Sequence, residues 1–325
     1  MDLMKHERYF WDQNIKYIAG IDEAGRGPLC GPVVAACVIF DKNISIEGIN
    51  DSKKLSPKKR KELFIKIKDN AIDLSYGIAN EIEIDEINIL QATFLAMKRA
   101  VENLKVKPNI LLIDGPHSDF KSIKTKNIIR GDSKSISIAA ASIIAKVVRD
   151  NIMKEYDKIF PNFGFIKNKG YGTKLHIDAL NDFKATPIHR KSFKIVKENL
   201  PSYSYYKKNK MFDILGKKLV AVKYIKKMFL LDQNNLFIKR LDDYIDYVFY
   251  NNEQKLYIKV ISIESDKITS NSKKNISNIS LYLKEIKKLI KKKEKNKKVI
   301  FNVILVEFKP KKKPSFKILY DEKVH

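Results

Sequence analysis

Two apolar segments on either side of a glycine-rich turn read YIAGIDEAGRG (17–27) and PVVAACVIF (32–40). The second segment is apolar almost throughout, which is typical of a strand that is covered on both faces of its sheet. Successive residues of a strand face opposite sides, so Asp22 and Glu23 can serve one site only where the chain turns. The glycines that follow permit such a turn. We therefore predict two neighbouring strands with a carboxylate site at the turn between them.

Beyond this hairpin, helical and extended patterns alternate along the sequence. Apolar residues at every third or fourth position from Ile84 to Leu104 predict a helix, and the apolar stretch 109–113 predicts a buried strand. Further helices are expected over 57–69, 137–159 and 173–183, and a further strand over 74–79. Residues 1–200 are therefore predicted to form one α/β domain with a central mixed sheet flanked by helices.

The pattern changes after residue 200. Residues 201–210 are polar and lack periodicity, which predicts a linker. A smaller α/β domain is expected over 211–310, and a basic tail over 311–325. The elements predicted in this second domain are helices over 211–228 and 279–290 and strands over 244–250, 255–263 and 299–307.

The net charge of +26 is unevenly distributed. Residues 1–200 hold 34 Lys and Arg against 25 Asp and Glu, a net +9, whereas residues 201–325 hold 30 against 13, a net +17. Positive charge attracts polyanions, of which nucleic acid is the usual one in a cell. Lys, Ile and Asn are all over-used, however, as they are in the products of AT-rich genes. Charge alone therefore leaves nucleic-acid binding open.

The sequence favours a cytoplasmic protein without a membrane segment. No apolar run reaches the about 18 residues of a membrane span. The first 14 residues carry three acidic side chains and no apolar run, which is unlike a signal peptide. Cys30 and Cys37 lack the spacing of a metal or redox motif, so we expect both to be small buried apolar residues.

Four carboxylates are predicted to lie near the ends of these elements. Asp114 ends the strand over 109–113, and Asp132 precedes the long helix over 137–159. Together with Asp22 and Glu23 they make an oxygen-rich site suited to Mg²⁺ or Mn²⁺. Two such ions roughly 4 Å apart can activate a water and stabilise the leaving oxygen in phosphodiester hydrolysis. An isolated Asp is more often a turn former or a helix cap, and only the joint occurrence favours a metal site.

Several short motifs carry a family resemblance, in the family's own order, over residues 16–198. They are DEAGRGP (22–28), GPVVAA (31–36), NDSKKL (50–55), IDG (113–115), GDS (131–133), SIAAASIIAKVVRD (137–150) and GYGT (170–173). In these motifs the chain resembles bacterial ribonuclease HII. The resemblance implies a ribonuclease H-like fold and an endonuclease, which is a hydrolase, that depends on Mn²⁺ or Mg²⁺, with two ions in the substrate complex.

The resemblance also implies the substrate and the residues that carry the reaction. The substrates would be RNA–DNA hybrids and duplex DNA with embedded ribonucleotides, nicked on the 5′ side to leave a 3′-hydroxyl and a 5′-phosphate by a monomeric enzyme. The residues that are both catalytic and metal-binding would be Asp22, Glu23, Asp114 and Asp132.

Substrate-binding residues follow from the same resemblance. The backbone of Gly25, Arg26 and Gly27 would contact the ribose 2′-hydroxyl, and Tyr171 would stack on the following deoxyribose. The alternative for Tyr171 is a core residue. Lys53, Lys146 and Arg149 are expected to be cations that contact phosphates or lie beside the site, and an exposed loop lysine is nearly as good an interpretation of Lys53. Two histidines, His176 and His189, are interpreted as structural or substrate-proximal, because the carboxylates already complete a site.

The second domain faintly resembles the YraN-type family of small restriction-endonuclease-like proteins. A working nuclease of that fold uses Asp and then Glu-x-Lys. Asp246 matches the first position, but the second motif reads Lys259-Val260-Ile261. The resemblance therefore predicts a domain without catalysis that keeps duplex binding. The basic runs over 290–298 and 309–314 are either phosphate contacts or solvated ends.

Two other functions remain open. The chain could be a binding module that works through its basic second domain, although the presence of all four carboxylates argues against this. It could also be another nuclease of the same superfold, such as a ribonuclease HIII or an integrase-like enzyme. Arg26 between two glycines and the lack of an N-terminal platform domain in this sequence disfavour that interpretation.

Overall fold

The computed structural model describes residues 2–115, 120, 123–232, 245–264 and 298–323. The chain divides into two compact units. The N-terminal unit contains Met1–Lys154, Gly164–Asn181 and Ile188–Glu198. The C-terminal unit contains Glu155–Phe163, Asp182–Pro187 and Asn199–His325. Two short segments from the region predicted as the first domain, 155–163 and 182–187, therefore belong to the C-terminal unit.

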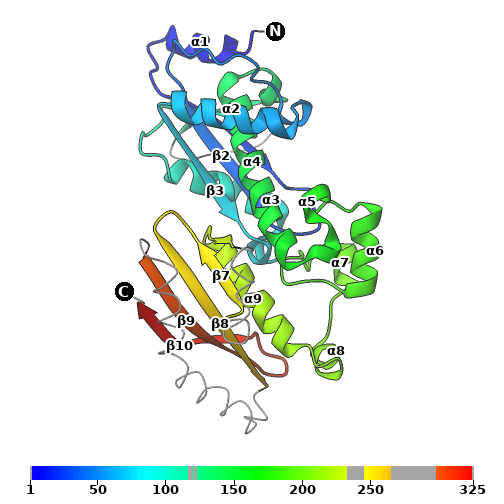
Figure 1. Ribbon diagram of the computed structural model, residues 1–325. Helices are drawn as coiled ribbons and strands as arrows, with labels where there is room; N and C mark the ends of the chain where they lie inside the picture. The colour runs from blue at the N-terminus through cyan, green and yellow to red at the C-terminus, as the bar shows by residue number, and fades with distance from the viewer. Residues whose placement is uncertain (1, 116–119, 121–122, 233–244, 265–297, 324–325) are drawn as a thin grey trace. The chain divides into compact units, whose positions relative to one another are not determined.

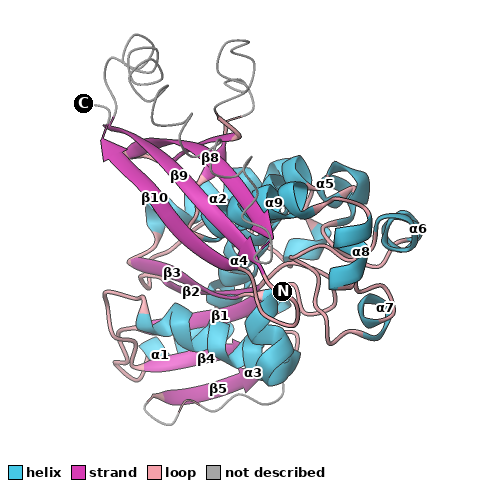
Figure 2. Ribbon diagram, turned by 90° about the horizontal axis from the view of Figure 1, so that it is seen from below, coloured by secondary structure: helices cyan, strands magenta, loops and turns pink. Residues whose placement is uncertain are grey.

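The N-terminal unit is built on a five-stranded mixed sheet of order β3-β2-β1-β4-β5, whose strands lie side by side in Figure 2. Its strands are β1 (Ile18–Ala24), β2 (Val33–Ile39), β3 (Asp73–Ala79), β4 (Ile110–Asp114) and β5 (Lys124–Ile128). Strand β1 pairs antiparallel with β2 and parallel with β4. The predicted mixed sheet is thus confirmed, and β5 is a strand that the sequence patterns did not indicate.

Helices cover both faces of this sheet. The helices from residue 5 to 197 are α1 (Lys5–Trp11), α2 (Pro57–Asn70), α3 (Glu81–Glu102), α4 (Ile136–Ile159), α5 (Phe165–Asn168), α6 (Lys174–Phe183) and α7 (Lys194–Lys197), with short 3₁₀ turns η1 (Ser52–Lys54), η2 (Gly131–Ser133) and η3 (Pro161–Phe163); η3 and the ends of α4 and α6 belong to the C-terminal unit. Apolar residues of α3 pack with β1, β2 and β4 in one core. Phe10 of α1 and Ile138 of α4 pack with other residues of β1 and β4 in a second core.

Local sequence explains where the helices begin. Ser56 accepts a hydrogen bond from the Lys59 N–H, and Pro57 occupies the first turn of α2, as is favoured at a helix start. Asn80 and Glu83 form a reciprocal capping box, so α3 begins three residues before the predicted position. Gly20 permits close packing of α4 on β1, since a Cβ there would lie 2.1 Å from the carbonyl carbon of Ser137.

The C-terminal unit has its own five-stranded sheet, of order β10-β9-β8-β7-β6. Its strands are β6 (Leu230–Leu231), β7 (Tyr247–Tyr250), β8 (Gln254–Glu264), β9 (Lys298–Phe308) and β10 (Ser315–Lys323), coloured yellow to red from β7 onward in Figure 1. Among the described strands of this sheet, only the β8–β9 pair is parallel. Helix α9 (Phe212–Lys226) packs closely on this sheet, because a Cβ at Gly216 would lie 2.1 Å from the Ser262 hydroxyl.

Two segments have more structure than the sequence patterns predicted. The region 201–210, expected to be a linker, contains helix α8 (Tyr203–Lys208), which the Ser202 side chain caps. The region 311–325, expected to be a basic tail, contributes β10, which pairs with β9. The predicted helix over 279–290 and nearly all of the basic run over 290–298 lie outside the described residues. Among the described helices, none is both long and apolar enough to cross a membrane.

Candidate active site

Three carboxylates from separate elements converge at one end of the N-terminal sheet. Asp22 lies on β1 and Asp114 ends β4, and these strands run parallel with Ile21 opposite Ile113. Asp132 lies in η2, and the N–H of Gly131 donates to Oδ1 of Asp114 at 2.6 Å. One oxygen from each of the three carboxylates lies within 4.8 Å of the others. The topology therefore brings together three of the four predicted metal ligands.

The carboxylate cluster carries negative charge that the protein leaves partly unneutralised. Burial raises the pKa of Asp22 well above its usual value, and the charges of Glu23 and Asp114 raise it further. The pKa of Asp132 is also raised, first by burial and then by the charges of Asp51 and Asp114. Buried carboxylates that repel one another favour a bound cation. Their oxygen donors fit a hard divalent ion such as Mg²⁺ or Mn²⁺.

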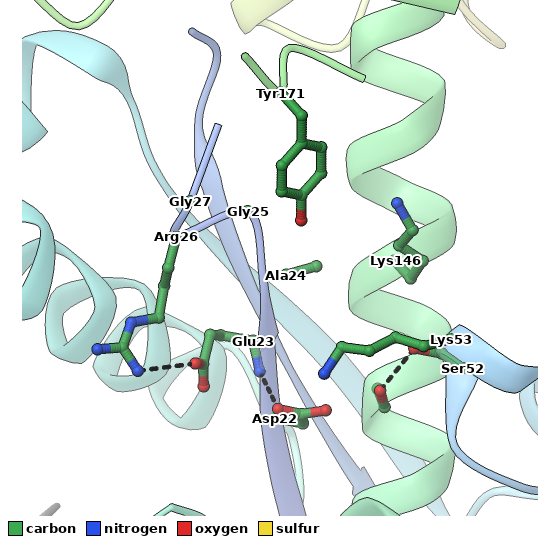
Figure 3. Close-up of a pocket in the computed structure, with 11 residues that line it drawn as sticks. Asp22, Glu23, Ala24, Gly25, Arg26, Gly27, Ser52, Lys53, Lys146 and Tyr171 are labelled. Carbon is green, nitrogen blue, oxygen red and sulfur yellow. Dashed lines mark hydrogen bonds and ion pairs between the residues drawn. The ribbon is translucent and has the colours of Figure 1, made fainter. Parts of the chain in front are cut away.

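Glu23, the fourth predicted ligand, lies next to this cluster rather than in it. Its Oε1 is 3.4 Å from Nη1 of Arg26, an ion pair drawn in Figure 3. Burial raises the pKa of Glu23, and the charge of Arg26 lowers it. The Glu23 N–H donates to Oδ1 of Asp22 at 2.7 Å, so the two adjacent residues are coupled through the backbone.

A cavity of about 340 Å³ opens beside Asp22 and Glu23. Its other lining residues are Ala24, Gly25, Arg26, Gly27, Ser52, Lys53, Ser142, Lys146 and Tyr171, most of which are labelled in Figure 3. Tyr171 is 45% exposed, which excludes the alternative of a core tyrosine. A Cβ at Gly27 would lie 3.5 Å from the Tyr171 ring, so the glycine loop and the tyrosine face the same space. The sequence motifs 25–27 and 170–173 thus meet at one cavity.

Lys53 reaches the cavity from the 3₁₀ turn η1. Its N–H donates to the Asp51 side chain at 2.8 Å, and the Ser52 and Ser142 hydroxyls are 2.8 Å apart, which fixes the turn against α4. Burial lowers the pKa of Lys53, but the charges of Asp22 and the other nearby acids outweigh that effect and raise it overall. Lys53 is therefore a cation held among the carboxylates.

Lys146 and Arg149 lie on α4 but play different structural roles. Lys146 lines the cavity, with Nζ 2.7 Å from Oδ1 of Asp150. Arg149 is 1% exposed and donates to the carbonyls of Pro32, Lys169 and Cys30, at 2.9, 2.9 and 3.2 Å. Three donors of the buried Arg149 are therefore used inside the protein, which does not support the predicted contact with substrate.

Both histidines singled out in the sequence are buried and bonded to each other. Nε2 of His176 lies 2.9 Å from Nε2 of His189, and Nδ1 of His176 lies 2.9 Å from the Tyr171 carbonyl. Both side chains are fully buried. Their structural interpretation is confirmed. The sequence patterns did not predict a role at the site for Asp51, Ser142 or Arg190. For Arg190 the only indication was that it follows His189.

An oxygen-rich metal site at the strand ends of this mixed sheet places the chain among metal-dependent nucleases with a ribonuclease H-like fold. A crystal structure of ribonuclease H2 from Pyrococcus horikoshii OT3 has the same fold, with a TM-score of 0.50 and 29% identity, and the match covers 56% of this chain and 96% of that one.

Residues 19–196 match the family model described as Ribonuclease HII. The chain is 55% identical over 193 residues to Ribonuclease HII of Clostridioides difficile (strain 630), covering 59% of this chain and 75% of that relative. It is 52% identical over 193 residues to Ribonuclease HII of Acholeplasma laidlawii (strain PG-8A), covering 59% of this chain and 95% of that relative. The chain belongs to the ribonuclease HII family and is a hydrolase of the ribonuclease H type. The interpretation as a ribonuclease HIII or an integrase-like enzyme is thereby superseded.

Proposed function

We propose that this chain is an endoribonuclease that hydrolyses the RNA strand of RNA–DNA hybrids and nicks duplex DNA on the 5′ side of embedded ribonucleotides. The products are a 3′-hydroxyl and a 5′-phosphate. The observation that supports this proposal is the shared cavity, in which Asp22 and Glu23 face the same space as the 25–27 loop and Tyr171. A site of this kind combines groups for phosphodiester hydrolysis with groups that can contact a sugar.

The donor set fits two divalent ions. Asp22, Asp114 and Asp132, with Glu23 beside them, would hold Mn²⁺ or Mg²⁺, whose charge would lower the pKa of a bound water and offset the charge on the leaving oxygen. The chain itself makes this place favourable for a cation. It holds carboxylates close together in a buried place, where repulsion disfavours the empty state.

The other lining residues are suited to holding a nucleic-acid strand. A glycine backbone without Cβ atoms lets a ribose approach closely, and peptide groups can donate to and accept from its 2′-hydroxyl. The exposed ring of Tyr171 offers an apolar face to the next sugar, where a second 2′-hydroxyl would be disfavoured. Lys53 and Lys146 supply positive charge for the phosphates on either side. Because every one of these residues comes from one chain, we propose that the enzyme acts as a monomer. We also propose that it acts on DNA in the cytoplasm.

The decisive assay uses a DNA duplex with a single ribonucleotide and the same duplex made wholly of DNA. With Mn²⁺ or Mg²⁺ we expect one nick at the ribonucleotide and none in the all-DNA duplex. EDTA and the variant Asp114→Asn should each abolish the nick. Asp69→Asn, the same chemical change at an exposed position of α2, is the matched control and should cut normally. A folded protein that leaves the ribonucleotide duplex intact would contradict the proposal.

For the C-terminal unit we propose duplex binding without catalysis. Its chain from 201 to 325 has a net charge of +17, from 30 basic and 13 acidic residues. Its Asp246 is paired with Lys217 and Lys259, at nitrogen–oxygen distances of 3.1 and 3.5 Å, so this carboxylate is neutralised by ammonium groups. Three exposed lysines, Lys311, Lys312 and Lys313, are available to phosphates.

A further inference from the structure

The segment Ile188–Arg190 is joined to the loop that follows the glycine turn. The N–H of Gly31 donates to the Ile188 carbonyl at 2.9 Å, and the N–H of Arg190 donates to the Leu29 carbonyl at 2.9 Å. Between these bonds Cys30 and His189 form an isolated antiparallel bridge. The backbone around His189 and Arg190 is therefore fixed directly against the loop that carries residues 25–31.

The Arg190 side chain is fully buried and holds four carbonyl groups of that loop. Its nitrogens donate to the carbonyls of Gly25, Arg26, Pro28 and Gly31, at 2.5, 2.8, 2.7 and 3.0 Å. Among the described residues, no carboxylate lies within ion-pair distance of it. Burial lowers the pKa of Arg190 to about 9, and the nearby charge of Arg149 contributes to the shift, so the guanidinium is still a cation at neutral pH. A buried cation is costly, and here its direct hydrogen-bond partners are backbone carbonyls, while the Phe193 ring, 5.2 Å away, and the charges of Glu81 and Asp85 also stabilise it.

This arrangement sets the direction of two amide groups. In a trans peptide unit the carbonyl of one residue points opposite to the N–H of the next. Arg190 draws the carbonyls of Gly25 and Arg26 towards the interior, so the N–H groups of Arg26 and Gly27 point the other way. Both residues line the cavity. Within the described part of the chain neither N–H has a protein acceptor at hydrogen-bonding distance, which leaves two donors for a substrate oxygen.

The neighbouring His189 supports the second substrate-contacting group. His176 lies 2.9 Å from the Tyr171 carbonyl through Nδ1, and a carbonyl only accepts, so Nδ1 must donate. Burial lowers the pKa of His176, which keeps the ring neutral, and its Nε2 therefore accepts from Nε2 of His189. Phe165 packs edge-on against the His176 ring. Two consecutive residues thus support the glycine loop and, through His176, the backbone of Tyr171.

We propose that His189 and Arg190 form a positioning pair that sets the ribose-reading geometry of the enzyme. Arg190 aims the Arg26 and Gly27 amides at the 2′-oxygen of the ribonucleotide. His189, acting through His176, fixes Tyr171 against the following deoxyribose. The pair touches no substrate atom itself, and its role rests on the proposed ribonucleotide-dependent nicking described above.

The first test uses Arg190→Lys, which keeps the charge but cannot span four carbonyls from one nitrogen. Binding to the single-ribonucleotide duplex and to the all-DNA duplex is compared in Ca²⁺, and kcat and KM are measured in Mn²⁺. We expect the preference for the ribonucleotide to fall about tenfold and KM to rise about tenfold, as for one or two lost hydrogen bonds, with kcat within about threefold of wild type. Phe10→Ala, a core substitution in α1, is the control for lost stability alone and should keep the preference.

The second test uses His176→Phe, which keeps an aromatic ring against Phe165 but removes the donor to the Tyr171 carbonyl. Cleavage is compared at a ribonucleotide followed by deoxyribose and at one followed by ribose. We expect this junction preference to fall about fivefold, as for one lost hydrogen bond, while Arg190→Lys leaves it unchanged. The two variants thus separate the two halves of the positioning pair.

The outcomes distinguish a failure of the proposed function from a failure of the positioning role. If the wild-type protein does not nick the single-ribonucleotide duplex, the proposed function fails. If wild type nicks it and both variants keep wild-type preferences, the positioning role is overturned. If Arg190→Lys does not fold, NMR of the wild-type protein labelled with ¹⁵N-glycine gives a second readout. The chain has 12 glycines, and the variant Gly27→Ala identifies the Gly27 signal. The Gly27 amide signal should shift with the ribonucleotide duplex and not with all-DNA, and equal shifts would overturn the proposal.

Discussion

Each unit of this protein buries an aspartate at a strand of a five-stranded sheet, but the surroundings are opposite in charge. Asp22 of β1 lies among other carboxylates, and burial together with their charges raises its pKa. Asp246, just before β7, lies 3.1 Å from Lys217 and 3.5 Å from Lys259 and accepts the Val260 N–H at 2.7 Å. The C-terminal carboxylate is neutralised by lysines of its own chain, whereas the N-terminal carboxylate lies in a cluster whose mutual repulsion favours an added cation.

The difference shows that a buried aspartate at a strand end does not by itself indicate a metal site. What matters is whether the neighbouring groups leave charge unbalanced. An unbalanced cluster lowers the stability of the metal-free protein and is retained where function requires it. An aspartate whose charge is offset by neighbouring lysines contributes to stability and does not need a metal ion to offset its charge.

The largest expected effect is on cleavage. Asp22→Asn should reduce nicking of the single-ribonucleotide duplex by about 1,000-fold, because several kcal/mol of metal-dependent stabilisation would be lost. Asp246→Asn should change the rate by less than about twofold. Steady-state kinetics in Mn²⁺ measure both values. A large loss of activity in Asp246→Asn would mean that the C-terminal unit takes part in catalysis.

The next largest difference between the two aspartates is expected in the stabilisation of the protein by bound Mn²⁺. At Mn²⁺ a hundredfold above its Kd, the wild-type N-terminal unit should gain about 2.7 kcal/mol of stability. We expect the same gain in Asp246→Asn and most of it to be lost in Asp22→Asn. Thermal unfolding with and without Mn²⁺ gives the measurement. Equal gains in wild type and Asp22→Asn would place the ion elsewhere.

In EDTA the two substitutions should have opposite effects on stability. Asp22→Asn should raise the free energy of unfolding by about 1–3 kcal/mol because it removes a buried, repelled charge. Asp246→Asn should lower it by about 1–3 kcal/mol because it removes a charge partner from the partly buried Lys217 and Lys259, although Lys217 keeps Asp213 at 2.9 Å. Urea denaturation near pH 8 measures both changes, and shifts of the same sign would refute the contrast.

The pH dependence of the Asp22 effect has a defined sign. Its pKa is raised in the folded protein, so the folded state binds the proton more tightly than the unfolded chain does. The contribution to stability is therefore present below the unfolded pKa of about 3.9 and is lost as pH rises through the raised folded value. The advantage of Asp22→Asn over wild type in EDTA should grow from about pH 5 to pH 8. If the stability advantage of Asp22→Asn shrinks over this pH range, the pKa of Asp22 is not raised in the folded protein.

The smallest expected effect tests the basic surface of the C-terminal unit. Changing Lys311, Lys312 and Lys313 together to Ala should weaken duplex binding by about three- to tenfold near 0.1 M salt. It should also reduce the slope of log K against log salt by about 2–3, as expected for two or three lost phosphate contacts. The triple change to Arg keeps the charge and should keep the slope. An unchanged slope in the Ala variant would remove these lysines from the binding surface.

The sequence was sufficient to predict most of the N-terminal site. Asp22 near the end of β1 and Asp114 at the end of β4 both come after apolar runs, which indicated their positions, and the motif around Tyr171 predicted its position by the glycine loop. The sequence did not indicate that Arg149 donates to backbone carbonyls inside the protein, because a basic residue is normally exposed. Arg190 was missed for the same reason. Carbonyl partners belong to every residue type and leave no pattern in a sequence.

The fold shows the same limit in its short elements. Helix α8 has six residues and is joined to β8 by the hydrogen bond from the Tyr203 hydroxyl to Glu264, and strand β10 lies at a sheet edge beside β9. Local propensity is weak over such lengths, so periodicity did not reveal them. The long helices α3 and α4 are stabilised along a continuous apolar face, and their positions were therefore predicted to within a few residues.

The bridge between Cys30 and His189 also makes the glycine loop chemically measurable. Burial raises the pKa of the Cys30 thiol to about 12, and Cys37 is likewise buried, within β2, with a raised pKa. A thiol in this state reacts with an alkylating reagent only when its surroundings open. Alkylation of Cys30 therefore reports how often the contact between 29–31 and 188–190 breaks, while Cys37 reports opening of the whole sheet. The ratio of the Cys30 alkylation rate to the Cys37 alkylation rate therefore measures local opening of the glycine loop in the native enzyme.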